Sequence, residues 1–181
     1  MSALLRLVFK LLLRSSALRL IADRRYSLKI VGPIGSMVQK ELPPLHDTFR
    51  SCFAGEVADL IPYYRAARCV IAPMISGSGT SIKTIEALAL GKPFVGTSKA
   101  FRGMPMDRLK AAGIYAHDDP QDFADAIVHA LCSEREAQAL SRAAYDNVFS
   151  VRASSASRDE ALRTATASRQ PMSLLRRLGL L

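Results

Sequence analysis

The strongest constraint on the fold is an alternation of short strand-like runs with helical runs along the chain. The first three strand-like runs end at a glycine or a proline, and a run of helical character follows. This alternation is typical of parallel strands joined by right-handed crossovers. The expected fold class is therefore α/β, a Rossmann-like open parallel sheet with helices on both faces. The strand-like runs are 26–32, 48–55, 68–73, 93–97 and 114–117, and the helical runs are 37–42, 56–67, 78–90, 106–113, 121–132 and 134–148.

The charge of the chain is concentrated at its ends. Residues 1–30 carry +6, residues 31–151 carry −1 and residues 152–181 carry +4, within a total of +9. A nucleic-acid-binding protein more often carries its basic residues on the globular part, so we expect no nucleic acid as a partner. Basic ends suit a membrane surface or an acidic partner better.

The first 25 residues contain three regularly spaced cations, Arg6, Lys10 and Arg14. On a helix they lie in one line and interrupt every apolar stretch, so the segment is amphipathic and is not a membrane span. A helix that covers a sheet, a helix on a membrane surface and a mitochondrial presequence remain open as explanations. The expected organisation is an amphipathic basic helix over 1–25, a Rossmann-like domain over 26–150 and a basic helical tail over 151–181.

The cysteines and histidines show no spacing typical of a disulfide framework or a metal site. Cys52, Cys69 and Cys132 are an odd number and form no C-x-x-C motif, so we expect reduced thiols and a cytoplasmic location, either free or at the membrane surface. No two histidines have metal-ligand spacing, so we expect no metal and assign no catalytic residue.

Each histidine has a separate structural expectation. His46 follows two prolines and is expected in a surface loop, and His129 is expected to be structural on its helix. His117 lies near a strand end, from which it could approach a cleft. Asp118 and Asp119 are expected to supply negative charge at the start of the next helix.

The expected ligand site lies along one edge of the sheet. In open α/β sheets, ligands bind beyond the carboxyl ends of the strands. Gly32, Gly55, Thr97 and the segment 73–79 all lie at those ends.

Small and hydroxyl residues precede the helix expected over 78–90. Unpaired amides and the positive dipole end of a helix attract anions, and glycines let the backbone approach a ligand closely. The pattern predicts a phosphate site, with Ser or Thr as an ordinary N-cap as the alternative explanation. The residues concerned are Gly77, Ser78, Gly79, Thr80 and Ser81.

Inside the same helix, Lys83 and Glu86 share a face with Thr80. The ammonium group of Lys83 suits a phosphate oxygen, whereas the carboxylate of Glu86 suits the hydroxyls of a sugar. The pair therefore fits a ligand with an anionic centre and a polyol end. A plain surface ion pair between Lys83 and Glu86 is the alternative.

Residues 63–97, YYRAARCVIAPMISGSGTSIKTIEALALGKPFVGT, resemble the C-terminal half of the group 1 glycosyltransferases, retaining enzymes of the GT-B fold. The segments FRSCFAGEV, at 49–57, and HDDPQDFADAI, at 117–127, extend the resemblance. It covers about residues 26–150 and implies one half of a GT-B fold.

The resemblance implies a donor domain that binds a nucleotide-diphosphate sugar as its substrate, without a cofactor. Residues 77–80 would hold the diphosphate or sugar, Glu86 the ribose, and the loop Gly55, Glu56 and Val57 would lie near the nucleobase. The family's acceptor-binding domain has no counterpart in the resemblance, so a separate acceptor domain or a membrane surface is the expected partner. We therefore expect a retaining glycosyltransferase that shows little transfer alone; a non-catalytic nucleotide-sugar-binding or assembly subunit is the alternative.

Overall fold

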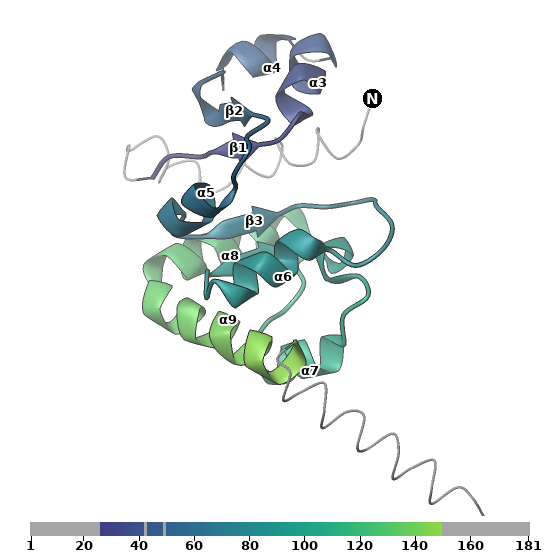
Figure 1. Ribbon diagram of the computed structural model, residues 1–181, viewed down its shortest axis with the longest axis vertical. Helices are drawn as coiled ribbons and strands as arrows, with labels where there is room; N and C mark the ends of the chain where they lie inside the picture. The colour runs from purple at the N-terminus through teal and green to yellow at the C-terminus, as the bar shows by residue number, and fades with distance from the viewer. Residues whose placement is uncertain (1–25, 42, 49, 150–181) are drawn as a thin grey trace, which may run out of the picture.

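The computed structural model describes residues 26–41, 43–48 and 50–149. The basic helix expected over 1–25 and the basic tail expected over 151–181 lie outside the described residues. Within the described ranges, short strands alternate with helices (Figure 1). The strands are β1 (Ile30–Val31), β2 (Phe53–Gly55), β3 (Val70–Ala72) and β4 (Phe94–Gly96). The α-helices are α3 (Ile34–Glu41), α4 (Pro43–Thr48), α5 (Ile61–Ala66), α6 (Ile82–Ala89), α7 (Met106–Ala111), α8 (Pro120–Cys132) and α9 (Glu134–Val148), and the 3₁₀ helices are η1 (Arg50–Cys52) and η2 (Ser98–Phe101).

The strand pairs among the described residues are parallel. β1 pairs with β2, β3 pairs with β4, and a parallel bridge joins Gly96 to Ala116, where a fifth strand was expected. The expected α/β class with parallel strands is therefore confirmed. The hydrogen bonds divide these strands into two two-stranded sheets instead of one continuous sheet. β1, β2 and β3 run in the same direction, so their carboxyl ends lie toward one side of the molecule (Figure 1).

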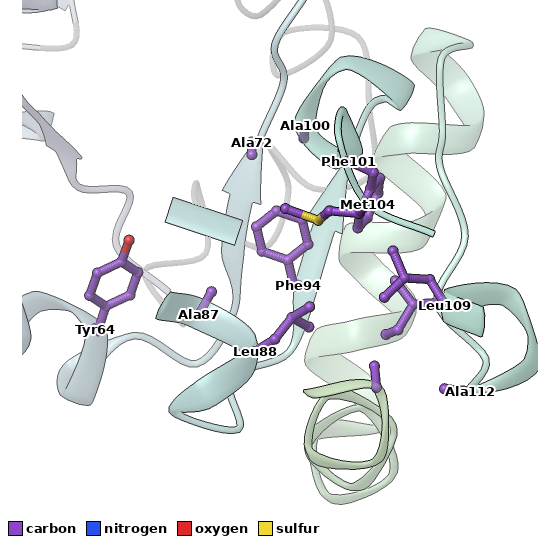
Figure 2. Packing of buried hydrophobic residues seen from close by; sticks show 12 residues of the cluster. Tyr64, Ala72, Ala87, Leu88, Phe94, Ala100, Phe101, Met104, Leu109 and Ala112 are labelled. Atoms are coloured by element: carbon purple, nitrogen blue, oxygen red, sulfur yellow. The ribbon is translucent and has the colours of Figure 1, made fainter. Parts of the chain in front are cut away.

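Helices cover both faces of the β3–β4 sheet. Phe94 of β4 packs into a core with Leu88 of α6 and Leu109 of α7, a cluster that Figure 2 shows. The next residue, Val95, packs against Phe123 of α8 in a second core. Successive side chains of a strand point to opposite faces, and both of these are buried. β4 is therefore apolar on both sides, as in a doubly covered parallel sheet, and the expected helices on both faces are confirmed.

The segment before β2 differs from its expectation. The strand expected over 48–55 begins only at Phe53, because α4 extends through Thr48 and η1 follows it. No helix was expected over 43–47, but α4 begins at Pro43. Proline suits the first turn of a helix, because its φ is already helical and the amide it lacks would have no partner there.

The two long helices near the end of the domain lie close to their expected bounds. α8 begins after Asp119, whose carboxylate accepts hydrogen bonds from the backbone amides of Gln121 (2.7 Å) and Asp122 (3.2 Å). Asp119 is thus an N-cap, which confirms its expected place at the helix start. α9 then packs across α6 and α7. Among the described residues, no helix combines the length and the apolar character that crossing a membrane requires.

Candidate functional site

The glycine-rich segment forms a loop in front of α6 and is not part of the helix. The helix was expected to begin near Ser78, but it begins at Ile82. Gly77 and Gly79 have φ values of +132° and +69°, which an α-helix cannot include. Residues 77–80 are all exposed, so their backbone is open to a ligand.

Two threonines join the chain on either side of this loop to the segment that follows β4. The Thr97 hydroxyl donates to the carbonyl of Met74, and the Thr84 hydroxyl donates to the carbonyl of Ala100 (2.6 Å). Ser81 corrects an expectation, because it is only 2% exposed and its Oγ lies 3.0 Å from the Thr84 hydroxyl. Its side chain therefore belongs to this internal network and does not face solvent as a donor for a ligand.

Arg102, which the sequence analysis did not select, lies against the glycine loop. A Cβ atom added to Gly77 would lie 3.1 Å from the Arg102 guanidinium, and one added to Gly103 would lie 2.7 Å from Thr80 Oγ1. Arg102 Nη1 donates to the carbonyl of Lys99 (2.9 Å), while its buried Nε has no hydrogen-bond partner. Arg102 forms no ion pair with any acid in the described part of the chain. An unneutralised cation thus borders the loop, and its position just after the carboxyl end of β4 is the signal that could have identified it.

Glu86 is held by a tyrosine rather than by the lysine on its own helix. Tyr64 of α5 donates its hydroxyl to Glu86 Oε2 (3.0 Å), and Glu86 is half-buried. Lys83 is exposed, and within the described residues it forms no ion pair with Glu86. The simple surface ion pair therefore does not describe this helix, and the two side chains act separately.

Burial of Tyr64 and its contact with Glu86 predict a tyrosine that loses its proton only at high pH. Burial, and then the hydrogen bond and negative charge of Glu86, raise the pKa of Tyr64 from 10.0 to about 12. Between these values the unfolded chain loses the proton while the folded chain keeps it, so the free energy of unfolding falls as the pH rises through this range. We expect Tyr64→Phe to remove the last step from a titration of phenolate absorbance.

Tyr115 provides the control for this titration, because its side chain is 54% exposed. Tyr115→Phe is expected to leave the late step in place. Loss of the same part of the curve in both variants would contradict the assigned pKa of Tyr64.

A second candidate feature is an open hollow beyond the carboxyl ends of β1 and β2. Its volume is about 380 Å³, and the Gly32 amide at its rim donates to the carbonyl of Gly55 (2.7 Å). The residues that line it include three that the sequence analysis selected. The lining consists of Val31, Gly32, Glu56, Val57 and Leu60.

The histidines occupy three different environments. His46 was expected in a surface loop, but it is buried in α4 and stacks on Phe53 at 5.3 Å between ring centroids. His117 follows the bridge to Gly96 and is half-buried, so burial lowers its pKa against the opposing charges of Asp122 and Asp118. His129 is exposed on α8. No cluster of three or more His, Cys, Asp or Glu side chains suited to a metal occurs among the described residues.

A comparison with protein families decides the family of this chain. Residues 9–133 match the family model described as glycosyl transferases group 1. The chain belongs to the group 1 glycosyltransferases. Comparisons with curated proteins and with solved structures gave no match. The resemblance noted in the sequence is thereby confirmed, and glycosyl transfer is the general function of the family.

The part of this group 1 glycosyltransferase that matches the family contains both candidate features. It runs through the hollow, the glycine loop, α6 and Arg102 and ends within the turn after α8. Helix α9 follows the matched range. The roles of individual residues in this range stay predictions.

Proposed function

We propose that this group 1 glycosyltransferase domain binds a nucleotide-diphosphate sugar along the carboxyl ends of its strands, as the donor half of a retaining GT-B enzyme. The observation that supports this most is the Arg102 guanidinium beside the exposed glycine loop. Together they offer a diphosphate a fixed cation and accessible backbone amides, at the side of the molecule where the strands end.

The diphosphate is the part of the ligand whose binding this arrangement of the glycine loop and Arg102 would stabilise most. Favourable placement of an anion at a helix N-terminus contributes about 0.3–1 kcal/mol when exposed and up to about 2 kcal/mol when partly buried. A guanidinium can add paired, charge-assisted hydrogen bonds to phosphate oxygens. During transfer, negative charge grows on the leaving diphosphate, and donors fixed in advance at the glycine loop stabilise it.

Glu86 supplies the hydroxyl-binding group one turn inside α6. Its Oε2 accepts from Tyr64, whereas its Oε1 has no hydrogen-bond partner among the described residues. The ribose of the nucleotide is the proposed ligand of this free oxygen. The base would then occupy the hollow beyond β1 and β2, and the exposed Lys83 would assist at the phosphates.

Transfer needs an acceptor in addition to the donor. Bringing an acceptor hydroxyl into line and excluding water are separate tasks from donor binding. We propose that a separate acceptor-binding domain, or a membrane surface that presents the acceptor, performs them on the cytoplasmic side. The donor site itself requires no cofactor in this proposal.

Calorimetry with a UDP-sugar and a GDP-sugar tests the donor site. We expect the unmodified chain to bind at least one of them, and Gly79→Val and Glu86→Ala each to weaken binding by about 10-fold or more. At Gly79 the φ of +69° disfavours valine, although the space around it is open. At Glu86 the substitution removes the carboxylate that is proposed to accept a hydrogen bond from a ribose hydroxyl.

Glu136→Ala is the matched control, because it removes an exposed carboxylate from α9. It should leave binding unchanged, and circular dichroism should report the same fold for all four proteins. Equal affinities of the unmodified chain, Gly79→Val and Glu86→Ala would defeat the site assignment.

A further inference from the structure

The hollow beyond β1 and β2 combines apolar walls with a single carboxylate. Val31, Val57 and Leu60 give it apolar surface, and Glu56 is the one charged residue among the five that line it. Glu56 is exposed, and within the described part of the chain its carboxylate has no hydrogen-bond or ion-pair partner, so it is open to a ligand. An ionised carboxylate accepts hydrogen bonds at two oxygens and donates none, so the hollow favours a flat ring with two adjacent donors.

The nucleobases differ in whether they can satisfy that requirement. Guanine presents a ring N–H and an amino group side by side, which match the two oxygens of a carboxylate. Uracil presents one N–H between two carbonyl oxygens, and these oxygens would face the negative charge of the carboxylate. Adenine and cytosine offer one amino group next to a ring nitrogen that accepts. Guanine is thus the base that gives the carboxylate two donors and no repulsion.

The backbone amide of Gly32 at the rim does not offset this preference. The amide of Gly32 already donates to the carbonyl of Gly55 at 2.7 Å, so it is not free to bind a carbonyl of uracil. The volume of about 380 Å³ is at the lower end of the range for ligand pockets and is sufficient for a base with part of its ribose.

We infer that Glu56 makes this site selective for guanine, so that the donor is a guanosine-diphosphate sugar. The inference rests on the proposed donor site and adds the identity of the base. Glu56 is the specificity-determining residue, because its carboxylate bonds guanine through two parallel N–H···O contacts and repels the carbonyls of uracil.

Calorimetry with GDP, UDP and ADP on the full chain tests the selectivity. We expect GDP to bind roughly 10- to 100-fold more tightly than UDP, as for one good bidentate contact to a base, with ADP weaker than GDP. Glu56→Gln should weaken GDP and reduce the ratio between GDP and UDP to less than about 3-fold. Glu136→Gln, which makes the same change on the exposed face of α9, should leave the ratio unaltered.

The outcomes separate this inference from the proposed function. If GDP and UDP bind equally and both are lost in Gly79→Val, the diphosphate site stands and the guanine selectivity is wrong. Tighter binding of UDP, or a ratio that Glu56→Gln does not change, would also overturn the inference. If no nucleoside diphosphate binds to the unmodified chain, the donor site itself fails and the selectivity fails with it.

Discussion

Phe101→Ala is expected to lower the free energy of unfolding by about 3–5 kcal/mol, the usual loss when a buried aromatic side chain is truncated. Phe101 is 1% exposed and meets the Phe94 ring edge-on, with 5.5 Å between the ring centroids. Figure 2 shows it beside Met104 in the core that α6, α7 and α9 cover. Its removal leaves a cavity between the sheet and η2, because the surrounding helices can collapse only partly.

Urea unfolding followed by circular dichroism measures this loss. Tyr115→Ala is the control, since this aromatic side chain is 54% exposed and its truncation should change the free energy by about 0.5 kcal/mol or less. Arg102 directly follows Phe101, so donor affinity should fall as well, even under conditions in which the variant stays folded. A Phe101→Ala variant as stable as Tyr115→Ala would contradict the packing described for this core.

The helices and strands that the sequence predicts well are those whose pattern is local. α8 and α9 were expected over 121–132 and 134–148 and lie within a residue of those bounds, because their apolar stripes repeat at helical spacing over many residues. The position of Asp119 also follows from local chemistry, since an aspartate before a proline and a helical run is a common N-cap.

The candidate site was predictable only in part, because its parts come together through tertiary contacts. Gly77 and Arg102 are 25 positions apart in the sequence, and no periodicity links them; only the crossover from β3 to β4 brings their loops together. Ser81 is similar, since a serine before a helix is equally suited to a ligand and to an internal bond. Its burial beside Thr84 decides between these roles, and the sequence around Ser81 contains no sign of that burial.

The lining of the hollow was predictable to a larger extent than the glycine loop. Gly32 was selected because a parallel strand ends there, whereas Glu56 and Val57 were selected because the resemblance places their loop near the nucleobase. The structure brings the three residues to one hollow. The rule about strand ends is topological, so it holds even though the strands are only two or three residues long. Leu60 escaped selection because it belongs to the start of a helical run, where an apolar residue more often packs in the core.

Gly96→Val is expected to destabilise the domain by about 3 kcal/mol, at the upper end of the usual range for overpacking. Gly96 ends β4, and a Cβ atom added there would lie 2.8 Å from Phe94 Cε1, 2.9 Å from Ala100 Cβ and 3.3 Å from Phe101 Cε2. The Ala100 Cβ can move only with its backbone. Relief therefore requires a shift of η2, which would also displace Arg102 from the glycine loop.

Gly79→Ala is the control for this substitution, because a side chain at Gly79 meets an unfavourable backbone conformation and no steric clash, whereas at Gly96 the reverse holds. Gly79 has a φ of +69° and no atom within 4 Å of the added Cβ, so its replacement costs only the left-handed conformation, about 1–2 kcal/mol. Gly96 has an ordinary backbone and lacks only space. Urea midpoints should place Gly96→Val below Gly79→Ala, and the reverse order would contradict the close packing of β4 on η2.

Combining Gly96→Val with Phe101→Ala provides the most specific test of that packing. The cavity left by Phe101 can accept part of the volume added at Gly96, because Phe101 Cε2 is one of the three atoms in close contact. The double variant should therefore lose less stability than the sum of the single losses, with a coupling of about 0.5–3 kcal/mol. Simple additivity would mean that the strain at Gly96 is borne by Phe94 and Ala100 alone, and η2 would then be anchored by the bond between Thr84 and Ala100 rather than by the aromatic core.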